Sequence, residues 1–246
     1  MDHARCALLA AIVLLLASLG ASAGDFATLN FIGFSKDGRY LAFEEHGTHD
    51  GSGFPYSDFY FLDVVKNSFA AAPVRVRIEN EAATERQARN RARIKATPLL
   101  RKFRIAERNT GQMVVSRLLT DVAVNNFLSA DPDKTQTVNF AEIIGSMYRL
   151  GDYDLILKPT EIRNKDCDYS DRPIYKLQLS LKEKEQNKSI TLQNDNALPS
   201  SRACPIHYAI QYVYLYENNI AVFLNTYHIG FEGPDMRYMA VTGKFK

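Results

Sequence analysis

Short segments in which hydrophobic and polar residues alternate recur along this chain, separated by turn residues. The clearest runs from Phe34 to Phe43, where Asp37-Gly38 supplies the positive φ angles of a tight hairpin turn. Residues 40–44 alternate with a period of two, as in a strand with one buried face, and residues 59–64 have the composition of a further strand. We therefore predict a β-meander in the N-terminal part of the chain.

A second segment with the same order of strands and turns lies near the C-terminus. Residues 212–224 resemble two strands around Asn218-Asn219, because asparagine also tolerates positive φ. A glycine, a phenylalanine and a proline precede the next strand, as they do at residues 53–55. We predict that residues 28–67 and 208–242 are related units of an internal repeat.

A segment of different composition follows the first unit. Residues 79–97 are rich in Ala, Arg, Glu and Gln, which favour helix. Pro98 is expected to end or kink this helix near Thr97. One apolar helical face is predicted from five residues at helical spacing: Ala88, Ala92, Ala96, Leu99 and Phe103.

Four further strands are predicted at residues 113–119, 153–157, 175–181 and 189–192. The expected fold class is mainly β, with propeller-like or sandwich-like meanders and one long amphipathic helix near residues 80–97. An α+β fold is the alternative. Because no low-complexity tract or long linker divides the chain, residues 24–246 are predicted to form a single mature domain.

The N-terminus has the three regions of a secretory signal peptide. Arg5 precedes an apolar run at residues 7–19, and small residues follow it up to Ala23. The apolar run is shorter than the roughly 18 residues of a spanning helix. We therefore predict that residues 1–23 are a signal peptide cleaved after Ala23, and that no integral membrane span remains. The predicted location is secreted or periplasmic.

Export also changes what the cysteines and the charge imply. If Cys6 leaves with the signal, Cys167 and Cys204 remain, and two cysteines in an exported protein most often form a disulfide. The formal net charge of +2 gives no global attraction to nucleic acid or membrane. No nucleic-acid partner is expected.

The motifs resemble two known patterns. The segment FSKDGRYLAF, followed by a strand that ends in LDV, is similar to one blade of a TolB-type β-propeller. Leu192 to Cys204 has the pattern LQxDxxLPxSRxC, and Gly230 to Arg237 has the pattern GFEGPDxR. Together with SKDGRYLAFEEHG and the Ala/Arg helix, these resemble the DUF2259 family of predicted secreted bacterial proteins of unknown function. This resemblance spans the mature chain, implies export and a single domain, and supplies no catalytic residues.

Residues 44–50 hold the densest cluster of metal-ligand residue types. His46, His49 and Asp50 offer two imidazoles and a carboxylate if their loop curls, but their spacing fits no established zinc motif. A polar loop between strands is the favoured interpretation. Residues 166–171 alternate acids as calcium loops do, yet they lack the EF-hand glycine and distal glutamate. No cofactor is predicted.

A strongly basic window occupies residues 86–104 and contains no acid. Its eight basic residues are Arg86, Arg89, Arg91, Arg93, Lys95, Arg101, Lys102 and Arg104. Outside the cytoplasm, the polyanions available to it are membrane headgroups, lipopolysaccharide and acidic wall polymers. We favour a solvated helix face, whose charge is offset by Glu79, Glu81, Glu85 and Glu107.

The sequence has no GxSxG, SxxK or HExxH motif to indicate nucleophilic or zinc catalysis. Two glycine-flanked aromatic loops are predicted to carry recognition, through Phe54, Pro55, Phe231, Glu232 and Pro234. Alternatively, both phenylalanines anchor their loops inward. The predicted function is an exported (periplasmic) non-enzymatic binding or envelope-associated protein, with an unknown envelope protein or polymer as its partner. The alternative is a metal-dependent hydrolase that uses the loop at residues 44–58.

Overall fold

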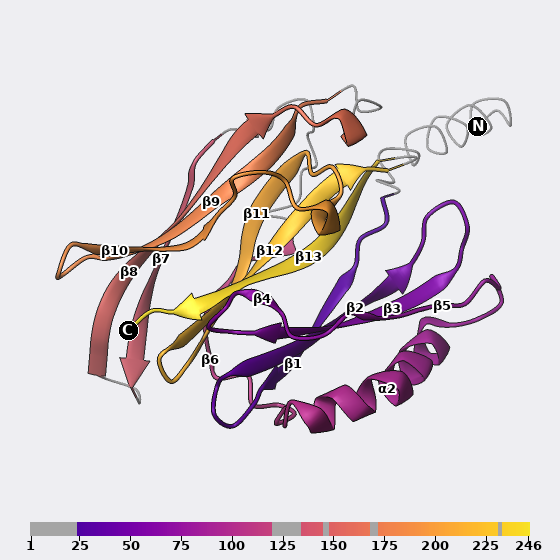
Figure 1. Cartoon of the computed structure of the whole chain (residues 1–246), viewed down its shortest axis with the longest axis horizontal. Coiled ribbons are helices and arrows are strands. Elements are labelled where there is room, and N and C mark those ends of the chain that lie inside the picture. Colours follow the sequence, from indigo (N-terminus) through magenta and orange to yellow (C-terminus); the bar gives the residue numbers. More distant parts are fainter. Residues whose placement is uncertain (1–23, 120–133, 145–147, 168–171, 231–232) are drawn as a thin grey trace, which may run out of the picture.

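In the part of the chain that the structure describes, three antiparallel sheets and one long helix make up the fold, as Figure 1 shows for the computed structural model. The structure describes residues 24–119, 134–144, 148–167, 172–230 and 233–246. The predicted signal peptide lies outside these ranges. The mainly β fold is confirmed.

The sheets are named here by their position. The N-terminal sheet contains β1 (Thr28–Phe34), β2 (Tyr40–Thr48), β3 (Pro55–Asp63), β4 (Ser68–Phe69) and β5 (Val74–Arg77). The central sheet contains β6 (Gln112–Ser116), β11 (His207–Tyr216), β12 (Asn219–Ile229) and β13 (Pro234–Lys244). The outer sheet contains β7 (Gln136–Ile144), β8 (Tyr148–Ile162), β9 (Ile174–Glu183) and β10 (Lys188–Asn194). The helix is α2 (Glu85–Lys102), and two 3-10 turns are η1 (Lys165–Cys167) and η2 (Ser200–Arg202).

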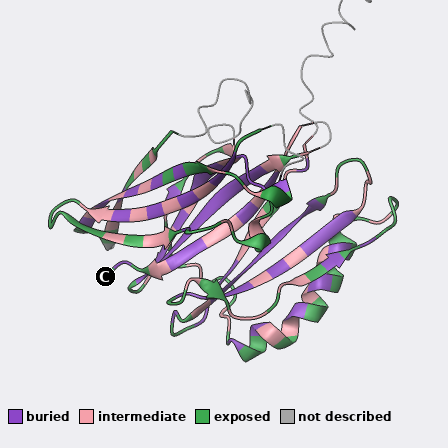
Figure 2. Cartoon of the chain, turned by 45° about the horizontal axis from the view of Figure 1, so that its top comes forward, coloured by how far each residue is buried: buried purple, intermediate pink, exposed green. Residues whose placement is uncertain are grey.

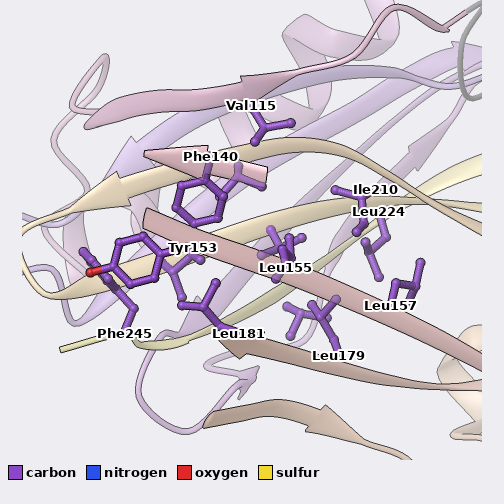
Figure 3. Close-up of a cluster of buried hydrophobic side chains, with 14 of the residues drawn as sticks. Val115, Phe140, Tyr153, Leu155, Leu157, Leu179, Leu181, Ile210, Leu224 and Phe245 are labelled. Atoms are coloured by element: carbon purple, nitrogen blue, oxygen red, sulfur yellow. The ribbon is translucent and has the colours of Figure 1, made fainter. Parts of the chain in front are cut away.

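Buried side chains show how these elements stack. One cluster joins α2 to the N-terminal sheet, a second joins that sheet to the central sheet, and a third joins the central sheet to the outer sheet. Figure 3 shows Leu155 and Leu157 of the outer sheet near Ile210 and Leu224 of the central sheet, with Tyr153 beside Phe245. The order of layers is therefore helix, N-terminal sheet, central sheet, outer sheet.

The central sheet is covered on both faces. In β12 every residue from Asn219 to Tyr227 is buried, and the middle of the sheet is uniformly purple in Figure 2. This explains the unbroken apolar run at residues 220–224, because a strand between two layers has no solvent face to require alternation. Stacked layers fit the sandwich-like prediction. The resemblance of the N-terminal segment to a propeller blade receives no support.

The two predicted meanders have the same strand order. β1, β2 and β3 are consecutive antiparallel neighbours, and so are β11, β12 and β13. Their first turns also meet, since the Tyr216 hydroxyl donates to the Lys36 carbonyl at 3.0 Å. The phenyl ring of Phe34 stacks on Tyr216, with ring centroids 5.2 Å apart. The predicted topology of both segments is therefore found.

Helix α2 differs from the prediction at both ends. It begins after Thr84, whose side chain and that of Gln87 form a reciprocal capping box. It continues through Pro98 to Lys102, so the expected stop at Thr97 is wrong. Pro98 is exposed, so water can hydrogen-bond to the backbone carbonyl that lacks a donor because proline has no N–H group. Leu100 and Phe103, which follow Pro98, are buried. Ala88, Ala92 and Ala96 are fully buried as predicted, but Leu100 rather than Leu99 completes the buried face.

Cys167 and Cys204 form a disulfide, with Cα atoms 5.8 Å apart. Cys167 lies in η1, in the connection between two outer-sheet strands, and Cys204 precedes β11 of the central sheet. The bond therefore links adjacent layers.

Candidate functional site

The basic window of α2 has only two of its eight bases in ion pairs among the described residues. Arg89 lies under the helix, where its guanidinium bonds both carboxylate oxygens of Glu44 at 2.9 Å. Burial opposes ionisation of Glu44, but hydrogen bonds from Arg89, Asn30 and Ser57 outweigh it and lower the pKa of this carboxyl. Arg93 pairs with Glu107. Arg89 is thus a structural residue that holds α2 to the sheet.

Two of the four acids expected to neutralise this window have their contacts elsewhere. Glu79 pairs with Arg77, and Glu85 pairs with His46 at 3.0 Å. Of the four acids, Glu107 alone forms an ion pair with a base of the window, among pairs between described residues. Six bases there have no ion pair within the described ranges: Arg86, Arg91, Lys95, Arg101, Lys102 and Arg104. The prediction of an offset charge is therefore not matched by the ion pairs.

Three of these six bases form what we name the basic stripe: Arg91, Lys95 and Lys102. All three are exposed, and their spacings of four and seven residues place them on one side of the helix. The stripe lies on a flank of α2 and not opposite the sheet, because Arg91 and Lys95 directly precede the buried Ala92 and Ala96, and successive residues of a helix are turned by about 100°. The three bases form a cationic surface that is open to solvent.

A hollow of about 580 Å³, which we name the basic hollow, lies at the C-terminal end of α2. Its charged lining consists of Lys36, Arg93, Arg101 and Arg104 with Asp37 and Glu107, and its apolar lining includes Leu100, Ile105 and Ala106. These residues come from the last turns of α2, the following connector and the β1–β2 turn. Backbone hydrogen bonds hold the connector in place, from Ile105 to Leu100 at 2.9 Å and from Ala106 to Phe34 at 3.0 Å. The hollow is thus built on fixed backbone.

A second group of charges lies buried between the N-terminal and central sheets. Asp25 is only 5 % exposed and contacts His49 at 2.9 Å, the Tyr56 hydroxyl at 3.3 Å and the guanidinium of Arg237. Burial opposes its ionisation, yet hydrogen bonds from His49 and Arg237 lower the pKa of Asp25. Nearby, Glu45 accepts hydrogen bonds from Tyr60 at 2.7 Å and from the Tyr238 amide at 2.9 Å. Asp25 is paired with a cation and Glu45 has a hydrogen-bond donor at each carboxylate oxygen, so we interpret this group as a structural network.

The predicted metal ligands do not come together. His46 faces α2 and pairs with Glu85, whereas His49 faces the opposite side of the sheet, pairs with Asp25 and stacks on Tyr56. Asp50 is exposed and accepts a hydrogen bond from the next amide. Across the described ranges, no three His, Cys, Asp or Glu side chains form a metal-binding group. Much of the predicted calcium loop, residues 168–171, lies outside those ranges.

The predicted recognition loops lie at one end of the fold. Asp25 contacts both of them. Its side chain contacts His49, which precedes the first loop. Its backbone amide donates a hydrogen bond at 3.0 Å to the carboxylate of Asp235, which follows the second loop. Phe54 is half-buried, Pro55 is buried, and Pro234 is half-buried. Phe231 and Glu232 lie outside the described residues. A recognition role for these loops stays a prediction.

Sequence reasoning missed the Asp25 network and the basic hollow. One signal for the network was available, because Glu44-Glu45 are two adjacent acids inside an apolar strand pattern. The hollow had no local signal, since Lys36 and Arg104 come together only when the connector after α2 pairs with β1.

The comparisons with known proteins give a family and a location. No curated protein matches the chain. Among the described residues, no helix is both long and apolar enough to cross a membrane. The sequence model of DUF2259, described as a predicted secreted protein, matches residues 42–244. That range covers most of the chain and includes α2, the central and outer sheets, and the N-terminal sheet from Ala42 onward, so that β1 lies before it. The chain therefore belongs to the DUF2259 family and is a secreted protein.

Proposed function

We propose that this secreted protein is a non-enzymatic binding protein of the cell envelope, exported by cleavage after Ala23, that engages a multivalent anionic partner through α2. The observation that carries the proposal is the set of six bases without ion pairs within the described ranges. An exposed cationic surface with six bases outside ion pairs attracts polyanions, and it costs little desolvation to use.

Two further observations support a binding role. The buried charges that would be candidates for catalysis are paired within the protein, as Asp25 is with Arg237 and His49. The basic stripe lies on a regular helix that three alanines and Arg89 fix against the sheet. A rigid cationic surface suits repeated contacts with a polymer or a membrane surface.

Co-sedimentation with lipid vesicles tests the proposal, with phosphatidylglycerol vesicles as the multivalent anion and phosphatidylcholine vesicles as the neutral comparison. The mature chain, residues 24–246, should bind only the anionic vesicles and should release them at high salt. Each base near an anionic surface contributes about 1 kcal/mol, so Arg91→Gln/Lys95→Gln/Lys102→Gln should bind roughly 100-fold more weakly.

The matched control is Lys158→Gln/Lys165→Gln/Lys188→Gln. It removes the same charge from three exposed lysines around the outer sheet, two layers away from the N-terminal sheet that carries α2. This variant should bind as the parent chain does. Absence of binding to anionic vesicles at low salt, or equal losses in both variants, would refute the proposal.

A further inference from the structure

We propose that the basic hollow is a binding site for a phosphomonoester group carried by a small hydroxylated molecule or by a lipid headgroup. This inference rests on the proposed function, because it names the ligand chemistry of one part of the cationic surface. It identifies one defined binding site within the wider cationic surface of α2.

The charge of the hollow suits one doubly charged anion. Its lining holds four bases and two acids, a balance of +2. Arg93 and Glu107 neutralise each other. Asp37 is held by hydrogen bonds from the Ser35 hydroxyl at 2.5 Å and the Arg39 amide at 3.2 Å, which lower the pKa of its carboxyl. This leaves Lys36, Arg101 and Arg104 against one acid, and a phosphomonoester carries about −1.5 to −2 at neutral pH.

The arginines are available because the helix end does not need them. The last carbonyls of α2 accept backbone hydrogen bonds, Leu99 from Phe103 and Leu100 from Ile105, both at 2.9 Å, and Arg101 from Arg104 at 3.0 Å. Since these carbonyls are already capped, the side chains of Arg101 and Arg104 are not required for that purpose. Two guanidinium groups beside a lysine are the arrangement that binds phosphate oxygens by paired, charge-assisted hydrogen bonds.

The remainder of the lining suits the organic part of such a ligand. A hollow of about 580 Å³ is much larger than a phosphate ion and has the size of a small-molecule site. Leu100, Ile105 and Ala106 offer apolar contact. The Thr97 hydroxyl donates to the Arg93 carbonyl at 2.8 Å, so its oxygen remains free to accept a hydrogen bond from a ligand hydroxyl.

Calorimetric titration of residues 24–246 with glycerol 3-phosphate, inorganic phosphate and glycerol tests the site, and vesicles containing phosphatidic acid test the lipid source. We expect glycerol 3-phosphate to bind more tightly than inorganic phosphate, and glycerol not to bind. Arg101→Gln/Arg104→Gln should weaken binding at least about tenfold. The matched control Arg91→Gln/Lys95→Gln removes the same charge from the same helix outside the hollow, and it should change the affinity less than about twofold.

Lys36 lies outside the helix, so Lys36→Gln provides a second variant if the double variant unfolds. It should also weaken the binding of glycerol 3-phosphate. Binding of phosphatidic acid vesicles alone, abolished by the hollow variants, would assign the phosphoryl group to a lipid headgroup. If neither phosphomonoester source binds, or if hollow and control variants weaken binding equally, the site is refuted. Retained binding of phosphatidylglycerol vesicles in that case would leave the proposed function standing.

Discussion

Two adjacent carboxylates on β2, Glu44 and Glu45, face opposite layers and are stabilised in different ways. Glu44 faces α2, where Arg89 keeps it ionised. Glu45 faces the central sheet, and burial raises the pKa of its carboxyl although Tyr238 and Tyr60 donate hydrogen bonds to it. Neighbouring residues of one strand therefore contribute to the pH dependence of stability with opposite signs.

The sign for Glu45 follows from proton linkage. Its folded-state pKa lies above the unfolded value of 4.5, so the folded protein holds this proton at pH values where the unfolded chain has lost it. The associated stability is complete below pH 4.5 and is lost as the pH rises through the folded pKa. For Glu44 the folded pKa is lowered, so its contribution is present at neutral pH and is lost in acid.

We predict that Glu45→Gln stabilises the protein at pH 7 by about 1 kcal/mol or more, because a neutral amide avoids the buried charge. The gain should shrink toward zero near pH 4. Urea denaturation between pH 4 and pH 8 measures the difference. Glu44→Gln is the matched control and should lose about 1–3 kcal/mol at pH 7, since it removes the negative charge from the pair with Arg89, whose side chain is partly exposed. A Glu45→Gln variant that is destabilised at pH 7 and approaches the parent protein in acid would contradict the prediction, because it would show that the carboxylate is ionised and stabilising.

At the scale of elements, α2 combines a face of small residues with an internal proline. Ala88, Ala92 and Ala96 are fully buried beside Ala42, Phe59 and Phe61, so the helix backbone lies close to the sheet. Pro98 interrupts the hydrogen-bond ladder four residues before the helix ends, on the exposed side. The packing of Leu100 and Phe103 beyond it maintains the helix.

Pro98→Ala should therefore raise the free energy of unfolding by about 2–2.6 kcal/mol. Alanine restores a backbone hydrogen bond and is more favourable than proline in a helix interior by about 3 kcal/mol. From this gain we subtract about 0.4–1 kcal/mol, because proline also lowers the conformational entropy of the unfolded chain. Chemical denaturation monitored by circular dichroism measures the change. Lys95→Ala, an exposed substitution one turn earlier, should stay within about 0.5 kcal/mol. Unchanged or reduced stability of Pro98→Ala would mean that the proline ring itself contributes to packing.

The sequence predicted the presence of these elements better than it predicted where they end or what covers them. The period of the alanines locates the buried face of α2 because packing against a sheet requires that spacing. Its end could not be predicted from Pro98, since the deciding contacts come from Phe61 and Tyr40, which pack on Phe103. β12 was similarly clear as a strand, but the apolar run at residues 220–224 does not say which sheets cover it.

At the scale of the whole molecule, the stacked layers depend on contacts between distant segments, and the disulfide is one of them. It joins residues separated by 37 positions, at a place where the outer sheet meets the central sheet. Both cysteines are buried. The bond therefore restricts the unfolded chain and also fixes one layer to the next.

Replacing Cys167 and Cys204 by serine should lower the free energy of unfolding by about 2–4 kcal/mol, as expected for a loop of this length. Urea denaturation of the double variant and of reduced parent protein should give similar losses. Thiol titration of the denatured, unreduced mature chain should find no free cysteine. Two reactive thiols, or equal stability with and without reductant, would contradict this assignment.

The candidate site also depends on contacts between distant segments, which local sequence patterns do not predict. The basic window was evident in the sequence, and its proximity to four acids suggested that its charge was offset. The structure pairs Glu85 with His46 of a different element, which no local pattern indicates. The basic stripe could be anticipated from helical spacing, whereas the hollow needed the long-range pairing of Ser35 with Ile105.

The contact between Asp25 and Arg237 joins residues 212 positions apart, and it bears on when the fold can be completed. Under the proposed cleavage after Ala23, the N-terminus is exported first, and Asp25 and the N-terminal sheet reach the outside long before β13 arrives. Until then Asp25 and His49 lack their cation, and the inner face of the N-terminal sheet has no central sheet to cover it. Closure of such a distant contact is also slow, because a long loop must be ordered first. Under that proposal, folding finishes only after nearly the whole chain has crossed the membrane, and an aromatic-rich sheet face is left uncovered in the meantime.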